Sequence, residues 1–100
     1  MVSLNIFKYM NINMLSSQFK ALGHPIRLNI ALGLLSKDNC DVSTMQDHLS
    51  IRQATLSQHL AVLKHAGIVS CQRSATRMCY SVSDKNIVRL LKAIRKGEKS

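Results

Sequence analysis

The stretch 52–67, Arg-Gln-Ala-Thr-Leu-Ser-Gln-His-Leu-Ala-Val-Leu-Lys-His-Ala-Gly, carries the side chains with the clearest chemical meaning. At 3.6 residues per turn, Leu56, Leu60 and Leu63 form one apolar stripe of a helix. The rest of the helix offers amides, hydroxyls, imidazoles and cations, and the stretch contains no carboxylate. An ordinary amphipathic surface helix usually mixes Glu with Lys. This pattern therefore favours a polyanionic partner with donor and acceptor edges, which describes nucleic acid.

The polar residues at the start of this predicted helix are the candidates for reading bases. A Gln side chain can form two hydrogen bonds with adenine. Ser57 could instead pack closely against a neighbouring helix, and His59 could bond within the domain. We expect base contacts from Gln53, Thr55, Ser57 and Gln58, with Arg52 and His59 able to contact bases or phosphates.

The charge of the chain is concentrated in its second half. The formal net charge is +9; residues 50–100 hold ten Lys or Arg against two acids, and residues 1–49 hold four against three. Such asymmetry is typical of a surface that binds a polyanion. Part of the excess lies in 95–99, which is also typical of a solvated tail.

Composition argues against several other classes of protein. Three cysteines without paired spacing do not form a disulfide framework, so a reducing cytoplasm is expected. No apolar run is long enough for a signal peptide or a membrane span. The chain has no phosphate-binding Gly-rich loop, its carboxylates are scattered, and His59 beside Ser57 is not a catalytic triad. We predict neither an enzyme nor a cofactor.

The chain reads as one domain, 1–100, that begins with four helices. Apolar spacing predicts a first helix over 4–22, which Gly23-His24-Pro25 ends. Pro25 suits the first turn of a second, largely buried helix. Asp41 is a good N-cap for a short third helix through Leu49, and Gly67 is a good terminator for the fourth helix, 52–66.

Two strands and a last helix follow. Alternating residues predict strands over 68–73 and 77–82. The connection Ser74-Ala75-Thr76 lacks Gly and Asn, so a loop longer than two residues is expected. Arg73, Thr76 and Arg77 would lie at the hairpin tip, within reach of phosphates. Ser83 is the expected N-cap of the last helix, 84–96. The fold class is mainly α with a β-hairpin wing, a winged helix-turn-helix.

Four segments closely resemble the ArsR/SmtB family of bacterial and archaeal repressors. They are Lys-Ala-Leu-Gly-His-Pro-Ile-Arg-Leu (20–28), Ala-Thr-Leu-Ser-Gln-His-Leu-Ala-Val-Leu (54–63), Ala-Gly-Ile-Val (66–69) and Cys-Tyr-Ser-Val (79–82). The similarity runs from about residue 15 to 94. It implies a homodimer built on helices 4–22 and 84–96. It also implies two helices in successive major grooves of double-stranded DNA, wings on the flanking backbone, and repression of a small operon relieved by an effector.

The chain departs from the family's effector sites. Metal-sensing relatives carry a Cys-x-Cys segment at the start of the third helix, where this chain has Cys40 alone, or histidines on the last helix, where it has none. The four histidines stand at positions with non-metal explanations, so no metal is predicted: His24, His48, His59 and His65. The hairpin resembles that of the haemolysin-activator and sulfide-responsive branch. The cysteine pair of that branch is absent, with Gly33 at its first position, so the effector is unknown.

The hairpin contains two cysteines, and whether they could have a redox role depends on the length of its loop. A three-residue loop would place Cys71 and Cys79 opposite each other on one face, where a strained, readily reduced bond could form. A two-residue loop would place them on opposite faces. The simpler alternative, which we favour, is that both are small strand hydrophobes.

Three functions remain open from the sequence. The first is a homodimeric repressor that reads an inverted-repeat operator. The second is a winged-helix module that binds protein, and the third is a thiol- or metal-responsive repressor. The basic second half and the arginines of the hairpin favour the first.

Overall fold

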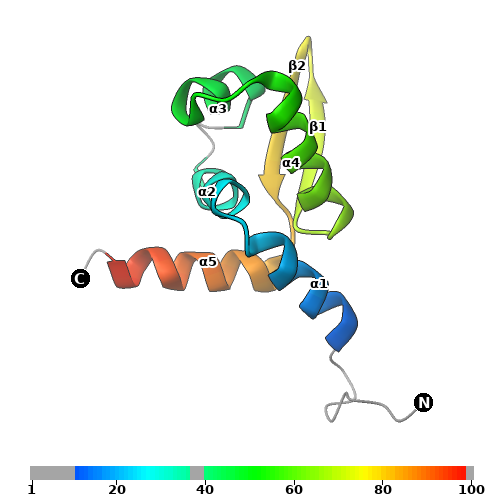
Figure 1. Ribbon diagram of the computed structural model, residues 1–100, viewed down its shortest axis with the longest axis vertical. Helices are drawn as coiled ribbons and strands as arrows, with labels where there is room; N and C mark the ends of the chain where they lie inside the picture. The colour runs from blue at the N-terminus through cyan, green and yellow to red at the C-terminus, as the bar shows by residue number, and fades with distance from the viewer. Residues whose placement is uncertain (1–10, 37–39, 99–100) are drawn as a thin grey trace.

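The computed structural model describes residues 11–36 and 40–98, and its elements follow the predicted order (Figure 1). They are α1 (Ile12–Leu22), α2 (Pro25–Gly33), α3 (Val42–Leu49), α4 (Gln53–His65), β1 (Val69–Ser74), β2 (Arg77–Val82) and α5 (Lys85–Glu98). The predicted winged helix-turn-helix is therefore confirmed. Residues 4–10 of the predicted first helix lie outside the described residues.

Local capping explains where α2 and α3 begin. Pro25 opens α2, and Nδ1 of His24 accepts a hydrogen bond from the backbone N–H of Ile26 at 3.1 Å. Asp41 is the predicted N-cap of α3, with Oδ1 accepting from the Thr44 N–H at 2.9 Å. Hydrogen bonds from Thr44, together with the nearby Arg77, hold the pKa of Asp41 below its ordinary value.

Gly67 terminates helix α4 two residues after its last residue, His65, as predicted. Gly67 has φ +76°, which favours glycine. Its N–H donates to the Lys64 carbonyl, and the N–H of Ile68 donates to the Leu63 carbonyl, both at 3.0 Å. This pair of bonds is the Schellman motif, and the fully buried Leu63 and Ile68 supply its apolar contact. The turn directs the chain from α4 into the wing, which we define as residues 69–82.

The apolar stripe of α4 lies in the centre of the core. Leu56, Leu60 and Leu63 are at most 2% exposed, as the helical spacing predicts. Helix α2 supplies Ile30 and Ala31 to the same cluster, and α5 supplies a third set of side chains. The core therefore fixes α4 by one face and leaves the other face at the surface.

The cap of α5 is Asp84, so the predicted Ser83 is wrong. Oδ1 of Asp84 accepts from the N–H groups of Asn86 and Ile87, whereas Ser83 uses its N–H to bond the Ile68 carbonyl. Burial raises the pKa of Asp84, but the bonds from Ile87, Gln18 and Asn86 outweigh it and lower the pKa overall. Nε2 of the buried Gln18 donates to Asp84 Oδ2 at 3.0 Å, which joins α1 to the start of α5.

The wing turns in two residues, which contradicts the longer loop expected. Ser74 pairs with Arg77, so Ala75 and Thr76 alone form the turn. Ala75 adopts φ +55° without the help of a glycine. Pairing of the two antiparallel strands continues to Val69 and Val82, and this register overrode the turn preference of the residues at the tip.

Candidate nucleic-acid interface

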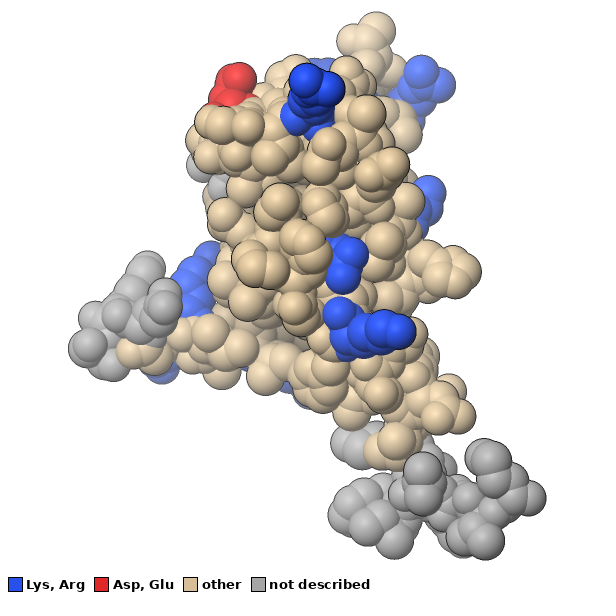
Figure 2. All heavy atoms as spheres, in the orientation of Figure 1, with Lys and Arg blue, Asp and Glu red and all other residues tan. Residues whose placement is uncertain are grey.

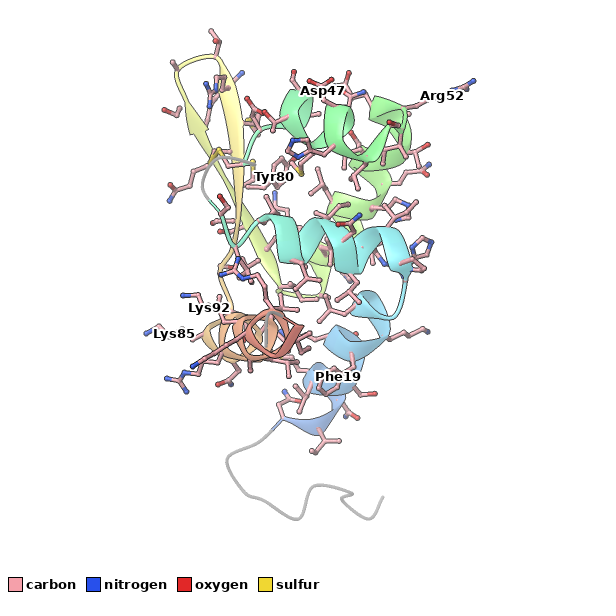
Figure 3. The ribbon with its side chains drawn as sticks, turned by 90° about the vertical axis from the view of Figure 1, so that its left-hand side faces the viewer. Phe19, Asp47, Arg52, Tyr80, Lys85 and Lys92 are labelled. Atoms are coloured by element: carbon pink, nitrogen blue, oxygen red, sulfur yellow. A yellow bond between two sulfur atoms is a disulfide. The ribbon has the colours of Figure 1, made fainter. Side chains whose placement is uncertain are left out.

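The start of α4 and the tip of the wing lie at the same end of the molecule, away from α1 and α5 (Figure 1). A short connection that begins at Ser50 joins α3 to α4. Ser50 is the C-cap of α3 and adopts a left-handed conformation with φ +54°. Arg52 is the N-cap residue of α4, and its side chain extends away from the body of the protein (Figure 3). The connection thus presents the first turn of α4 to solvent.

The predicted base-reading residues occupy this first turn and its surroundings. Gln53, Ser57 and Gln58 are exposed, and Thr55 is half-buried at the edge of the face. Gln53 and Ser57 lie closer to the leucine stripe around the helix than Gln58 does, yet both are exposed, because no neighbouring element covers that side of the first turn. The structure therefore exposes three polar side chains on a helix that contains no carboxylate.

His59 lies differently from the other candidates because it is half-buried against α2. Its ring centroid is 4.7 Å from that of His24, and the rings are tilted by 50°. Burial lowers the pKa of His59, and the neighbouring His24 and Arg27 lower it further. The structure thus places His59 at the α2–α4 contact, the intradomain position that was its alternative.

The tip of the wing is exposed and basic. Arg73, Thr76 and Arg77 are all exposed there, at the positions expected from the strand pattern. Nη2 of Arg77 is 3.7 Å from Oδ2 of Asp41, in a pair whose Arg77 side chain remains 67% exposed. A surface ion pair of this kind is weak, typically about 0–1 kcal/mol. Arg77 can therefore exchange Asp41 for another anion.

The cysteines pair differently from the prediction. The register sets Cys71 opposite Tyr80 and Cys79 opposite Gln72, so Cys71 and Cys79 lie on opposite faces of the hairpin. Cys79 instead forms a disulfide with Cys40, and Cys71 is free (Figure 3). This single bond is not a framework of several disulfides, but its partner Cys40 was not among the predicted redox residues. Residues 40 and 79 are 39 apart in sequence, and only the tertiary fold brings them together.

Further cations extend the candidate interface beyond the predicted residues. Figure 2 shows Lys and Arg side chains from the end that carries α3 down to α1, with acidic atoms confined to one upper corner of this face. A groove of about 610 Å³ runs between α1, α2 and α4. Its lining residues include three that carry or can gain a positive charge and no acid: Lys20, Arg27 and His65. Lys20 could not be placed beside α4 from sequence spacing alone.

Other classes of site find little support in the described part of the chain. Among residues 11–36 and 40–98, no group of three or more His, Cys, Asp or Glu side chains converges as a metal site would require. Every helix in those same ranges is too short or too polar to cross a membrane.

A helix pair that exposes the polar face of its second helix, followed by a basic hairpin, defines a winged helix-turn-helix protein. A family model described as "Bacterial regulatory protein, arsR family" matches residues 24–70. A regulator of the helix-turn-helix type from Methanocaldococcus jannaschii is 36% identical over 76 residues, which is 76% of this chain and 85% of that protein. The chain therefore belongs to the ArsR family.

One further relative and two solved structures support this assignment. A biofilm growth-associated repressor from Agrobacterium fabrum is 40% identical over 75 residues, 75% of this chain, although the match spans only 63% of the repressor. HlyU from Vibrio cholerae superposes with a TM-score of 0.80 at 28% identity, covering 91% of this chain and all of HlyU. A homodimeric winged helix-turn-helix domain from Mycobacterium bovis gives 0.75 at 25% identity, covering 99% and 91% of the two chains.

Proposed function

We propose that this chain is a homodimeric transcriptional repressor that binds double-stranded DNA in the cytoplasm. The observation that carries the proposal is the exposed start of the carboxylate-free helix α4 at the same end of the molecule as the basic wing tip. Phosphate contacts position such a protein and base contacts give it sequence preference. The Agrobacterium relative is named a repressor, which supports the direction of regulation.

Each predicted site residue has a place in this proposal. Helix α4 enters the major groove, where Gln53, Ser57 and Gln58 contact base edges and Thr55 contacts them from the rim. His59 supports the helix from its buried side. The backbone is contacted by Arg52 at the start of α4 and by Arg73, Thr76 and Arg77 at the wing tip.

The proposed dimer uses α1 and α5. Met14 and Phe19 on α1 and Ile94 on α5 are 46–50% exposed, although they are large and apolar. Both helices lie at the end of the molecule opposite the wing tip and the start of α4 (Figure 1). A second copy packed there would cover these side chains and present two α4 helices to one face of DNA. The M. bovis structure is described as homodimeric, which supports the same assembly.

Selection of bound duplexes from a random DNA pool tests the proposal. We expect an enriched inverted repeat with half-sites about one helical turn apart. Retention of duplexes without enrichment would reduce the function to nonspecific binding. Failure to retain DNA at low salt would contradict the proposal and favour the protein-binding alternative.

A further inference from the structure

We infer that Cys40 and Cys79 form a reversible thiol-oxidation site that fixes the wing to the helix-turn-helix and thereby strengthens DNA binding. The effect on affinity rests on the function proposed above. The bond itself and its effect on wing motion do not.

The backbone holds the two cysteines together independently of the bond. Their Cα atoms are 4.8 Å apart, within the range that disulfides use. The N–H of Tyr80 donates to the Cys40 carbonyl at 2.9 Å, and Asp41 and Cys79 form an isolated β-bridge. The bond can therefore form and break without moving the chain far.

The position of the bond matters because it joins two DNA-binding elements. Cys40 lies two residues before α3, the first helix of the helix-turn-helix, and Cys79 lies in the middle of β2. Residues 72–78, which form the outer part of the wing, are exposed, so the hairpin projects beyond the core. A cross-link at Cys79 holds this projecting part at its base and limits how far Arg77 can swing.

The chemistry requires an external oxidant, for which we name a hydroperoxide. One thiolate attacks the peroxide oxygen and becomes a sulfenic acid, and for hydrogen peroxide the leaving group takes up a proton as water. The second thiol attacks that sulfur, forms the S–S bond and releases the hydroxyl as a second water. Two thiols and one peroxide thus give one disulfide and two waters. Two molecules of a small thiol reverse the step and leave as their own disulfide.

The third cysteine provides an internal control. Cys71 lies on the other face of the hairpin from Cys79, across from Tyr80. Its thiol is free. Burial raises the pKa of the Tyr80 hydroxyl, and the neighbouring Cys71 raises it further. Cys71 is therefore outside the proposed switch, and the fold offers a cysteine on the same hairpin that should not respond.

The direction of the effect follows from preorganisation. A wing that is already fixed loses less conformational freedom when it binds, so the oxidised protein should bind more tightly. The Arg77–Asp41 pair works against this, since it engages a phosphate-binding arginine. That pair is exposed and weak, so we expect preorganisation to dominate.

The test compares the full chain after peroxide and after reduction with dithiothreitol. Thiol titration and peptide mass spectrometry report the bond, and anisotropy reports affinity for a fluorescein-labelled duplex of random sequence, since the wing is proposed to contact backbone. We expect the oxidised protein to bind roughly three- to tenfold more tightly. Cys40→Ser and Cys79→Ser should show the reduced affinity in both buffers, and Cys71→Ser should respond as the parent does.

Two results would overturn the inference. One is peroxide treatment that leaves Cys40 and Cys79 as free thiols. The other is a bond that forms while affinity stays equal or falls. If neither state binds DNA, the proposed function fails separately. Amide hydrogen exchange over 69–82 then tests whether the Cys40–Cys79 bond limits the motion of the wing. Slower exchange in the oxidised protein would support it, and equal exchange would contradict it.

Discussion

Among single residues, Gln53 and Gln58 of α4 have the most specific proposed role. Gln53→Ala and Gln58→Ala should each reduce the preference for a selected operator over random DNA. The expected loss is about 1–3 kcal/mol per bidentate contact, because the bonds to a base edge disappear while the phosphate contacts remain. Competition binding measures this ratio. Asn29→Ala, an exposed amide on α2, is the control and should change nothing. Unchanged specificity in both Gln variants would mean that another face of the protein reads the DNA.

The wing arginines should act on all sequences alike. If a dimer neutralises about six to eight phosphates, the slope of log K against log salt should be about −5 to −7. Arg73→Ala or Arg77→Ala removes one phosphate contact per protomer, so the slope should flatten by about 1.8 with specificity preserved. Lys92→Ala is the matched control, since Lys92 lies at the far end of the molecule (Figure 3). A loss of sequence preference with an unchanged slope would reassign these arginines to base contacts.

His59 should make folding stability depend on pH. Its pKa in the folded protein is lowered from the ordinary 6.5, so the unfolded chain binds more protons in the interval between the two values. The contribution of neutral His59 to folding stability is therefore fully present above pH 6.5, and it is lost as the pH falls toward the pKa of His59 in the folded protein. Urea unfolding between about pH 7.5 and about pH 5.5 should show this decrease, and His59→Gln should reduce it. The exposed His48→Gln is the control and should retain the pH dependence of the parent.

At the scale of elements, the wing turn offers a gain in stability. Ala75 holds φ +55°, which an alanine adopts at a cost and a glycine does not. Ala75→Gly should therefore stabilise the hairpin, by about 1 kcal/mol if the strain exceeds the greater freedom of glycine in the unfolded chain. Thr76→Gly removes a side chain at the adjacent position, where the described backbone has no positive φ, and should destabilise. Equal effects of the two variants would show that Ala75 stores no strain.

The helices were predictable because each is specified by its own residues. The stripe of Leu56, Leu60 and Leu63, the cap at Asp41 and the stop at Gly67 are local signals, and the structure confirms all three. The same signals placed the polar face of α4 and the wing tip on the surface. The roles of those residues in binding remain a prediction.

What the sequence could not supply depends on contacts between distant segments. The two-residue turn follows from strand pairing that Ala75 and Thr76 do not themselves encode. That register places Cys79 on the opposite face from Cys71 and beside Cys40. Along the chain, Cys40 is separated from Cys79 by α3, α4 and β1. Gln18 is buried for the same reason, because its partner Asp84 lies 66 residues away.

At the scale of the whole molecule, the exposed apolar side chains of α1 and α5 should hold two protomers together. Sedimentation should show a dimer at roughly micromolar concentration. Phe19→Glu and Ile94→Glu should shift it toward monomer, because each buries a charge at the proposed contact. Met78→Glu makes the same change on the wing, at a side chain 43% exposed, and should leave the dimer intact. A monomeric parent protein would contradict the assembly.

The bond between Gln18 and Asp84 has a consequence for the spacing of the DNA that such a dimer would accept. It joins α1 to Asp84, the residue directly before α5, so we expect this bond to help fix the angle between the two helices of the proposed contact. In a two-fold assembly, a change in that angle would be doubled across the symmetry axis and carried along the body of each protomer to α4. The preferred spacing between operator half-sites would then depend on a hydrogen bond far from the DNA. Gln18→Leu would change which spacing binds best before it changed which bases are read.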